Sequence, residues 1–189
     1  MHYRTLEIPD VLMLEPARLG DERGFFSEVY SRAATAEAGI DLDIAQENYS
    51  LSAATNTVRG LHFQAPPCAQ AKLVQVVSGA MLDVVVDLRR GSPWYGQYIS
   101  IELSAENWAQ LWVPVGFAHG FCTLEPDTAV IYKVSTPFSA EHDSGIFWND
   151  PDLKIDWPVA EGNAILSEKD ASLQAFRDFD TPFSYEGQS

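Results

Sequence analysis

Short stretches in which apolar and polar residues alternate follow one another through most of the chain. Turn residues rich in glycine and proline separate these stretches. The alternation predicts strands at 44–52, 56–63, 72–78, 80–88, 97–103, 108–113, 119–125 and 128–134. Short strands at nearly regular spacing are typical of an antiparallel sandwich or barrel. We therefore expect a mainly β fold.

The N-terminal part of the chain predicts smaller elements. Two short strands are expected within the first fifteen residues. A glycine-bounded loop at 20–24 and a strand at 25–30 follow them. Ser31 and Gly39 are placed to begin and to end a short alanine-rich helix over 32–38.

Beyond Phe138 the pattern becomes irregular. A short helix is expected to open after Ser167, with Asp170 as its third residue. The tail, about residues 179–189, is expected to be loosely ordered. Because no repeat or linker interrupts the chain, we expect residues 1–189 to form a single domain with short flanking helices.

Composition narrows the possible functions. The net charge of −15 disfavours binding to nucleic acid and to anionic membranes. No apolar run of about 18 residues and no signal segment is seen, so a cytoplasmic protein is expected. Two cysteines are too few for a disulfide framework. With only twelve lysines and arginines, an anionic ligand would require a local cluster of positive charge.

One stretch concentrates candidate chemistry. Arg59, His62 and Lys72 fall within fourteen residues of strand-like sequence. A histidine held still beside a lysine is a minimal arrangement for taking a proton from carbon. Of the four histidines, His2 and His142 lie in polar segments, whereas His62 and His119 lie in apolar ones. Each of the latter two could instead be a hydrogen-bonded core histidine.

A first resemblance concerns His119. The segment Pro114-Val115-Gly116-Phe117-Ala118-His119 is similar to the second motif of the cupin superfamily. Cupins are jelly-roll barrels that often hold a metal. The matching first motif, His62-Phe63-Gln64, has glutamine where metal-binding cupins have a second histidine. Two histidines and a glutamine are poor ligands for zinc or iron. No metal is therefore expected.

A closer resemblance covers most of the chain. In their order, ten segments resemble the dTDP-4-dehydrorhamnose 3,5-epimerase family, metal-free cupins that act on nucleotide-linked 4-keto-6-deoxy sugars. The segments are 23–28, 46–50, 59–64, 70–74, 83–89, 91–93, 116–121, 132–133, 148–151 and 167–170. The resemblance implies a cupin-type jelly-roll β-sandwich or barrel and epimerisation at C3 and C5 of a dTDP-4-keto-6-deoxy-hexose through an enolate. It implies no cofactor.

The resemblance also implies roles for individual residues. His62 would be the base, Asp170 would orient it, Lys72 would stabilise the enolate, and Tyr132 would be the acid on the other face. The implied substrate-binding residues are Arg23, Phe26, Glu28, Gln46, Asn48, Arg59, His119, Phe138 and Lys169. Lys169 could equally be an exposed lysine at a helix start. Asp83 is a candidate to orient His119 or Lys72, or a purely structural carboxylate.

One departure from the family pattern leaves the regiochemistry open. Phe138 stands where the family has a second tyrosine, six residues after Tyr132. The ring is kept and the hydroxyl is lost, so epimerisation at one carbon competes with the double reaction as a hypothesis. A metal-dependent cupin enzyme and a non-catalytic sugar-nucleotide binder are two further hypotheses, from different functional classes. The family also implies a homodimer, in which N-terminal strands would bring Arg23, Phe26 and Glu28 to the partner's site.

Overall fold

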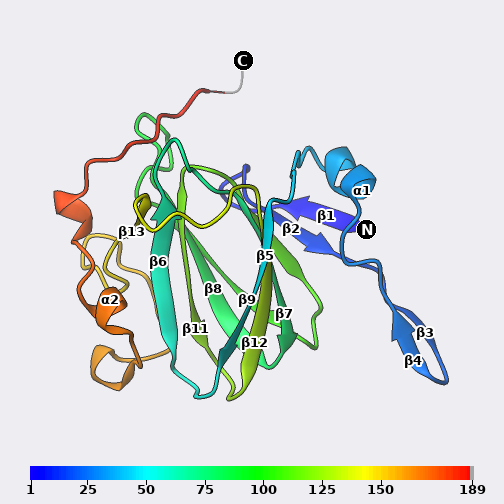
Figure 1. Cartoon of the computed structure of the whole chain (residues 1–189). Coiled ribbons are helices and arrows are strands. Elements are labelled where there is room, and N and C mark those ends of the chain that lie inside the picture. The colour runs from blue at the N-terminus through cyan, green and yellow to red at the C-terminus, as the bar shows by residue number, and fades with distance from the viewer. Residues whose placement is uncertain (188–189) are drawn as a thin grey trace.

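Two antiparallel sheets face each other and form the body of the protein (Figure 1). The structure is a computed structural model that describes residues 1–187. The six-stranded sheet has the order β1 (His2–Thr5), β2 (Leu12–Glu15), β10 (Gln110–Val113), β7 (Lys72–Ser78), β12 (Thr128–Val134) and β5 (Gln46–Ser52). The five-stranded sheet has the order β13 (Asp143–Gly145), β6 (Val58–Gln64), β11 (Phe117–Thr123), β8 (Ala80–Asp87) and β9 (Tyr98–Ser104).

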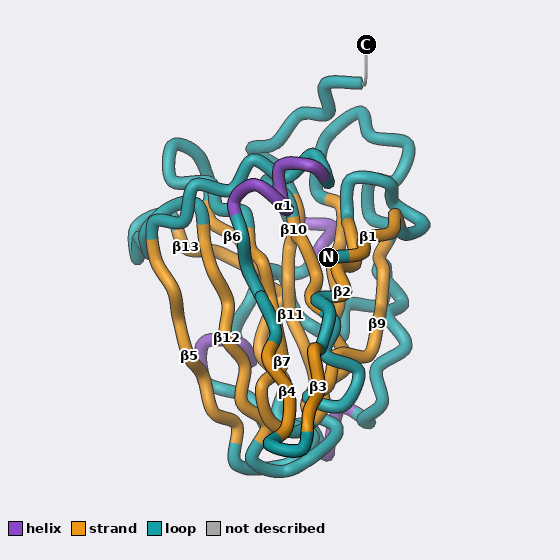
Figure 2. Tube along the Cα trace, turned by 90° about the vertical axis from the view of Figure 1, so that its right-hand side faces the viewer, coloured by secondary structure: helices purple, strands orange, loops and turns teal. Residues whose placement is uncertain are grey.

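The predicted mainly β sandwich is confirmed. The eight stretches expected between residues 44 and 134 correspond to β5 through β12, with boundaries that differ by a few residues. Figure 2 shows β5, β12 and β7 side by side, as the sheet order requires. Strand β13 was not predicted, because three residues are too few to show an alternating pattern.

Apolar clusters lie on both faces of each sheet. The cluster between the sheets includes Val74 and Val76 of β7 and Val85 of β8. Val84 and Val86 point the other way, into a second cluster on the outer face of the five-stranded sheet. This arrangement explains why three consecutive valines are fully buried.

The outer face of the six-stranded sheet is covered by the segment around helix α1 (Arg32–Glu37). Ile40 and Leu42, just after this helix, pack against Leu73 of β7. The predicted helix is confirmed, and Gly39 follows it with a positive φ of 77°. Ser31 occupies the N-cap position without a side-chain capping bond.

A two-stranded arm extends away from the body (Figure 1). It consists of β3 (Leu19–Asp21) and β4 (Gly24–Phe26), with Glu22 and Arg23 at the turn. The prediction of a loop at 20–24 and a strand at 25–30 was therefore wrong in its boundaries. The strand begins earlier and ends at Phe26, because its partner β3 has only three residues.

The C-terminal segment packs over the outer face of the five-stranded sheet. It contains the short helices η1 (Glu161–Asn163), α2 (Glu168–Ala171) and η2 (Phe176–Asp178). The predicted helix after Ser167 is confirmed as α2, with Asp170 as its third residue. None of the helices within residues 1–187 combines the length and the apolar character needed to cross a bilayer.

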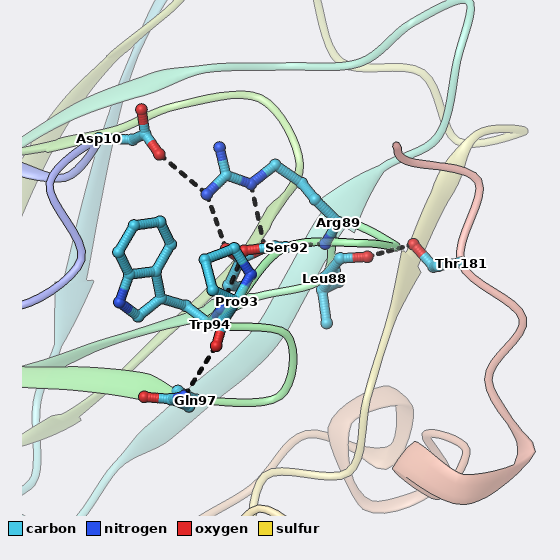
Figure 3. A network of polar contacts seen from close by, with 9 residues as sticks. Asp10, Leu88, Arg89, Ser92, Pro93, Trp94, Gln97 and Thr181 are labelled. Atoms are coloured by element: carbon cyan, nitrogen blue, oxygen red, sulfur yellow. Dashed lines mark hydrogen bonds and ion pairs between the residues drawn. The ribbon is translucent and has the colours of Figure 1, made fainter. Parts of the chain in front are cut away.

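The tail is held more firmly than predicted up to Tyr185. The Thr181 hydroxyl donates to the carbonyl oxygen of Leu88 (Figure 3), and Phe183 is buried in the outer cluster. Main-chain bonds join Arg90 to Phe183 and Tyr185 at 2.9 Å each. The expectation of a loose tail from residue 179 was wrong for this part, and residues 188–189 lie outside the described residues.

Arg89 ties the N-terminal loop to the same region. Its guanidinium lies 2.9 Å from Asp10 and 2.7 Å from the buried Asp87, and the Ser92 hydroxyl donates to Asp87 at 2.7 Å. Figure 3 shows Arg89 between Asp10 and Ser92. Burial alone would lower the pKa of Arg89, but the two carboxylates raise it, which keeps the guanidinium charged.

Candidate active site

A cavity of about 260 Å³ opens between the two sheets. Both sheets and the segment around α2 contribute its walls. A second cavity of about 340 Å³ adjoins it and shares His62, Lys72, Tyr132 and Lys169 with it. The first cavity is lined by Ser50, Arg59, His62, Lys72, His119, Phe121, Val130, Tyr132, Ser167, Lys169 and Asp170.

Strand register places the side chains of the six-stranded sheet on this inner face. Tyr132 pairs with Asn48 on one side and with Val74 on the other. Lys72 lies two residues before Val74 on β7 and therefore shares its face. The alternation that predicted the strands thus also brings Lys72, Tyr132 and Asn48 to one wall.

A β-bulge in β6 arranges the opposite wall. His62 pairs with His119 and Arg59 pairs with Phe121, so β6 has one residue more than β11 over this span. In a regular strand, residues three apart would point to opposite faces. The extra residue allows Arg59 and His62 to line the same cavity.

His62 and Asp170 form a short polar contact in the cavity. Nε2 of His62 lies 2.5 Å from Oδ1 of Asp170, although 108 residues separate them. The Asp170 side chain is 5% exposed and the His62 side chain 27% exposed, so the carboxylate is covered while the ring reaches the cavity. Because an ionised carboxylate can only accept, Nε2 carries the proton and Nδ1 is left with a lone pair.

Asp170 is kept ionised by its neighbours. Burial would raise its pKa, but the hydrogen bonds from His62 and Ser167 and the electrostatic attraction of His62 and Lys169 hold it below the usual value. Ser167, the N-cap of α2, donates from Oγ to Oδ2 of Asp170 at 2.9 Å and accepts from the Asp170 main-chain N–H at 3.1 Å. The helix start therefore fixes the carboxylate.

The ammonium group of Lys72 has a lowered pKa and reaches the cavity. Among residues 1–187 its ammonium has no hydrogen-bond or ion-pair partner. Burial lowers the pKa of Lys72 to about 8, against the raising effect of Asp83 and Asp143 and with the help of Lys169. Such an ammonium is still mostly charged at neutral pH and can donate to an anionic oxygen.

Tyr132 keeps its proton at neutral pH. Burial raises the pKa of its hydroxyl more than the nearby charge of Arg59 lowers it. Tyr132 lies on the six-stranded sheet, whereas His62 lies on the five-stranded one. The cavity therefore has a proton acceptor on one wall and a proton donor on the other.

His119 is oriented by a carboxylate of its own. Its Nε2 lies 3.0 Å from Oδ2 and 2.9 Å from Oδ1 of Asp83, and both residues are buried. Of the roles considered for Asp83, this contact favours the orientation of His119. The ring borders the cavity next to Phe121.

The second cavity is more polar and carries Phe138 at its boundary. Gln46 donates to Asn48 at 2.6 Å, and its amide oxygen accepts from the main-chain N–H of Phe138 at 3.1 Å. Lys169 pairs with Asp143. Arg59 uses two of its N–H groups on Ser52 and Leu51 and is exposed, which leaves donors for an anionic group.

Three predicted binding residues lie elsewhere in the chain. Arg23, Phe26 and Glu28 are exposed and border neither cavity. Arg23 instead binds Asp21 within the arm at 2.5 Å. The predicted site residues apart from these three all border at least one of the two cavities.

Several lining residues were missed from the sequence. Ser50 and Phe121 lie two residues from Asn48 and His119, so strand alternation could have identified them. Asp143 had no local signal, because it lies on the unpredicted β13. In the described part of the chain, no group of three or more His, Cys, Asp or Glu side chains is arranged to hold a metal ion.

Comparison with known proteins assigns the chain to a family. The sequence model of the dTDP-4-dehydrorhamnose 3,5-epimerase family matches residues 5–178. An epimerase of that name from Sinorhizobium fredii is 50% identical over 185 residues, which cover 98% of this chain and 94% of the relative.

Solved structures agree. The Bacillus anthracis dTDP-4-dehydrorhamnose 3,5-epimerase, with TDP and PPi bound, is 49% identical with a TM-score of 0.88, covering 92% of this chain and 99% of its own. The Legionella pneumophila dTDP-6-deoxy-D-glucose-3,5-epimerase, in complex with dTDP-4-keto-L-rhamnose, is 38% identical with a TM-score of 0.93, covering 98% and 100%. Sequence and fold together confirm the predicted resemblance, and the chain belongs to the dTDP-4-dehydrorhamnose 3,5-epimerase family.

Proposed function

We propose that the protein epimerises C3 and C5 of a dTDP-4-keto-6-deoxy-hexose and converts dTDP-4-dehydro-6-deoxyglucose to dTDP-4-dehydrorhamnose. The observation that carries the proposal is the His62–Asp170 pair on one wall of the cavity, opposite Tyr132 and Lys72 on the facing wall. Epimerisation next to a ketone needs a base, an acid on the other face and a positive group at the oxygen. These four residues supply all three.

The hydrogen bond between His62 and Asp170 supports the following proton transfers. Nδ1 of His62 takes the proton from the carbon beside the C4 ketone, and the C–H electron pair moves to form an enolate. The ammonium of Lys72 donates to the enolate oxygen. The hydroxyl of Tyr132 then returns a proton to the opposite face, and the carbonyl reforms. Asp170 stabilises the imidazolium meanwhile. Proton exchange with water then returns His62 to its neutral form and Tyr132 to its protonated form.

Positive side chains beside the cavity suit the diphosphate. Arg59 and Lys169 border it together with Lys72, three of the twelve lysines and arginines in the chain. Arginine can bind phosphate oxygens with two parallel N–H groups. The second cavity, with Gln46, Asn48 and Phe138, has polar and flat surfaces for the nucleoside.

Deuterium exchange tests the reaction and its regiochemistry together. The protein is incubated in heavy water with dTDP-4-keto-6-deoxyglucose, and loss of the C3 and C5 proton signals is followed by NMR. We expect exchange at both carbons. Exchange at a single carbon would support a single-carbon epimerase, the alternative that the missing hydroxyl of Phe138 leaves open. Exchange at neither would refute the proposed function.

A His62→Asn variant separates an enzyme from a binding protein. We expect it to lose exchange while it still binds dTDP, because it removes the base and leaves the charged residues in place. His2→Asn is the matched control, since His2 is exposed on β1 and lines neither cavity. Exchange that persists in His62→Asn would contradict the role of His62.

The arm supports a second part of the proposal, a homodimer. Leu19, Phe25 and Phe26 on the arm are 67%, 51% and 69% exposed. Edge strand β5 also exposes Tyr49 and Leu51. Exposed edges and apolar side chains are typical of surfaces that pair with another chain. In such a dimer, Arg23, Phe26 and Glu28 would reach the partner's cavity.

The oligomeric state tests this part. Light scattering after gel filtration at micromolar concentration is expected to give the mass of two chains. A Phe26→Asp variant is expected to give the mass of one chain and to bind dTDP less tightly. A wild-type monomer would contradict the dimer without affecting the assignment of His62 and Tyr132.

A further inference from the structure

A single buried glutamine holds both neighbours of Phe138. Gln64 lies on β6, two residues after His62, and is 4% exposed. Its Nε2 donates to the carbonyl oxygen of Pro137 at 3.2 Å, and its Oε1 accepts from the main-chain N–H of Ser139 at 2.8 Å. Phe138 is therefore bracketed by one side chain from the strand that carries His62.

The amide of Gln64 can serve this purpose in one orientation only. Its second N–H donates to the carbonyl oxygen of Cys68 at 2.7 Å. Both carbonyl groups are acceptors and the Ser139 N–H is a donor, so exchanging the amide oxygen and nitrogen would break all three bonds. A buried amide with every contact matched fixes the loop in one position.

Two more glutamines hold the same loop. Gln70 donates to the carbonyl oxygen of Thr136 at 2.6 Å, and Gln46 accepts from the N–H of Phe138 at 3.1 Å. The main chain from Thr136 to Ser139 is thus fixed at every residue by a glutamine side chain. The ring of Phe138, in contrast, is 60% exposed beside the second cavity.

A large exposed ring on a rigid main chain is suited to stacking. An aromatic face that is already fixed loses little conformational freedom when a flat ligand binds on it. We propose that Gln64 is a positioning residue that holds Phe138 as a stacking platform for the base of the nucleotide. This proposal rests on the proposed function, because it takes a nucleoside diphosphate as the ligand.

Replacing Gln64 with methionine tests the proposal. Gln64→Met keeps the volume and removes all three hydrogen bonds. We expect it to weaken dTDP binding, measured by calorimetry, by about tenfold, because the loop loses three bonds and only part of the loss is recovered by relaxation. KM is expected to rise by a similar factor and kcat to change much less. Gln75→Met is the matched control, because Gln75 is 5% exposed and bonds to Gln110, away from the loop.

A double-mutant cycle separates positioning from general stability. If Gln64 acts through Phe138, then Gln64→Met has little further effect on dTDP affinity in a Phe138→Ala background. Additive losses, or equal losses in Gln64→Met and Gln75→Met, would overturn the proposal.

A measurement without ligand keeps the two proposals distinct. 4-Fluorophenylalanine at position 138 reports the mobility of the ring by fluorine NMR. We expect the fluorine signal to sharpen in Gln64→Met and to stay unchanged in Gln75→Met. An unchanged signal in both variants would overturn the positioning role. Absence of turnover and of dTDP binding in the wild type would instead refute the proposed function and the stacking ligand, whatever the fluorine result.

Discussion

The His62 ring is bound at one nitrogen so that the other is free to take a proton. Nε2 is committed to Asp170, which is itself bound by Ser167 at its second oxygen. The hydrogen-bonded series Ser167, Asp170 and His62, anchored at the start of helix α2, therefore orients the ring of the proposed base. In the proposed mechanism the charge of Asp170 matters as much as its position, because it stabilises the imidazolium that His62 becomes when it takes the proton.

Asp170→Asn is expected to keep the fold and lose most of the activity. An amide can still meet Nε2 of His62, but it carries no charge, so kcat should fall by roughly 10²- to 10³-fold, within the range typical of a general base. Steady-state kinetics give kcat, and thermal unfolding checks the fold. Asp150→Asn is a suitable control, since the buried Asp150 accepts main-chain bonds from Asp152 and Phe176 outside the cavity. Equal kcat values in wild type and Asp170→Asn would contradict the role of Asp170.

Lys72 predicts a pH limit on the basic side. With a pKa of about 8, lowered by burial, the ammonium is charged below that pH and neutral above it. In the proposed mechanism only the charged form of Lys72 stabilises the enolate, so kcat/KM should decline as pH rises through about 8. In Lys72→Arg the guanidinium stays charged, and this limb should move to above about pH 10. Profiles of kcat/KM against pH for the wild type and Lys72→Arg test this assignment. If the decline occurs at the same pH in both proteins, a group other than Lys72 causes it.

At the scale of single elements, β6 shows how a local irregularity builds the site. Its bulge comprises Gly60 and Leu61, and the φ of Gly60 is +119°. A Cβ at this position would lie 2.5 Å from Cα of Gly120 and 2.8 Å from the carbonyl oxygen of His119. Both contacts are with main chain and cannot be relieved by a rotamer change. Only glycine fits here, and the spacing of Arg59 and His62 depends on it.

Gly60→Ala is therefore expected to destabilise the protein by more than about 2 kcal/mol, from backbone strain and overlap together. The activity that remains should also fall, because β6 must shift and carry His62 with it. Chemical denaturation and turnover at low temperature measure the two effects. Gly162→Ala is the control, since a Cβ there meets nothing within 4 Å. A free energy of unfolding equal to that of Gly162→Ala would show that the bulge is not required.

The sequence predicted these elements unevenly, for physical reasons. Strands such as β7 and β8 were found because burial against a core imposes a regular pattern on the residues. Strand β13 was not found and the arm was found only with wrong boundaries, because three-residue strands carry no such pattern. The contact between His62 and Asp170 could not be read locally across 108 residues. It came from family resemblance, whereas the support of Phe138 by Gln64 became visible only in the structure.

At the scale of the whole molecule, the net negative charge of the protein opposes the approach of the proposed anionic substrate. The chain has a net charge of −15, yet Arg59, Lys72 and Lys169 border one cavity. An anionic nucleotide sugar is repelled at long range and attracted at short range. Salt separates the two effects, because the screening length is about 30 Å at 0.01 M and about 8 Å at 0.15 M.

The rate of substrate capture should therefore pass through a maximum as salt increases. Between about 0.01 and 0.15 M the repulsion by the distant acidic surface is screened first, so kcat/KM should rise by a few-fold. At higher salt the attraction by Arg59 and Lys169 is screened as well, and kcat/KM should fall. Sodium chloride titrations at subsaturating substrate measure this, with sucrose at equal osmolarity as the control. A steady decline from the lowest salt would mean that the local positive cluster dominates at all distances and that the acidic surface does not oppose binding.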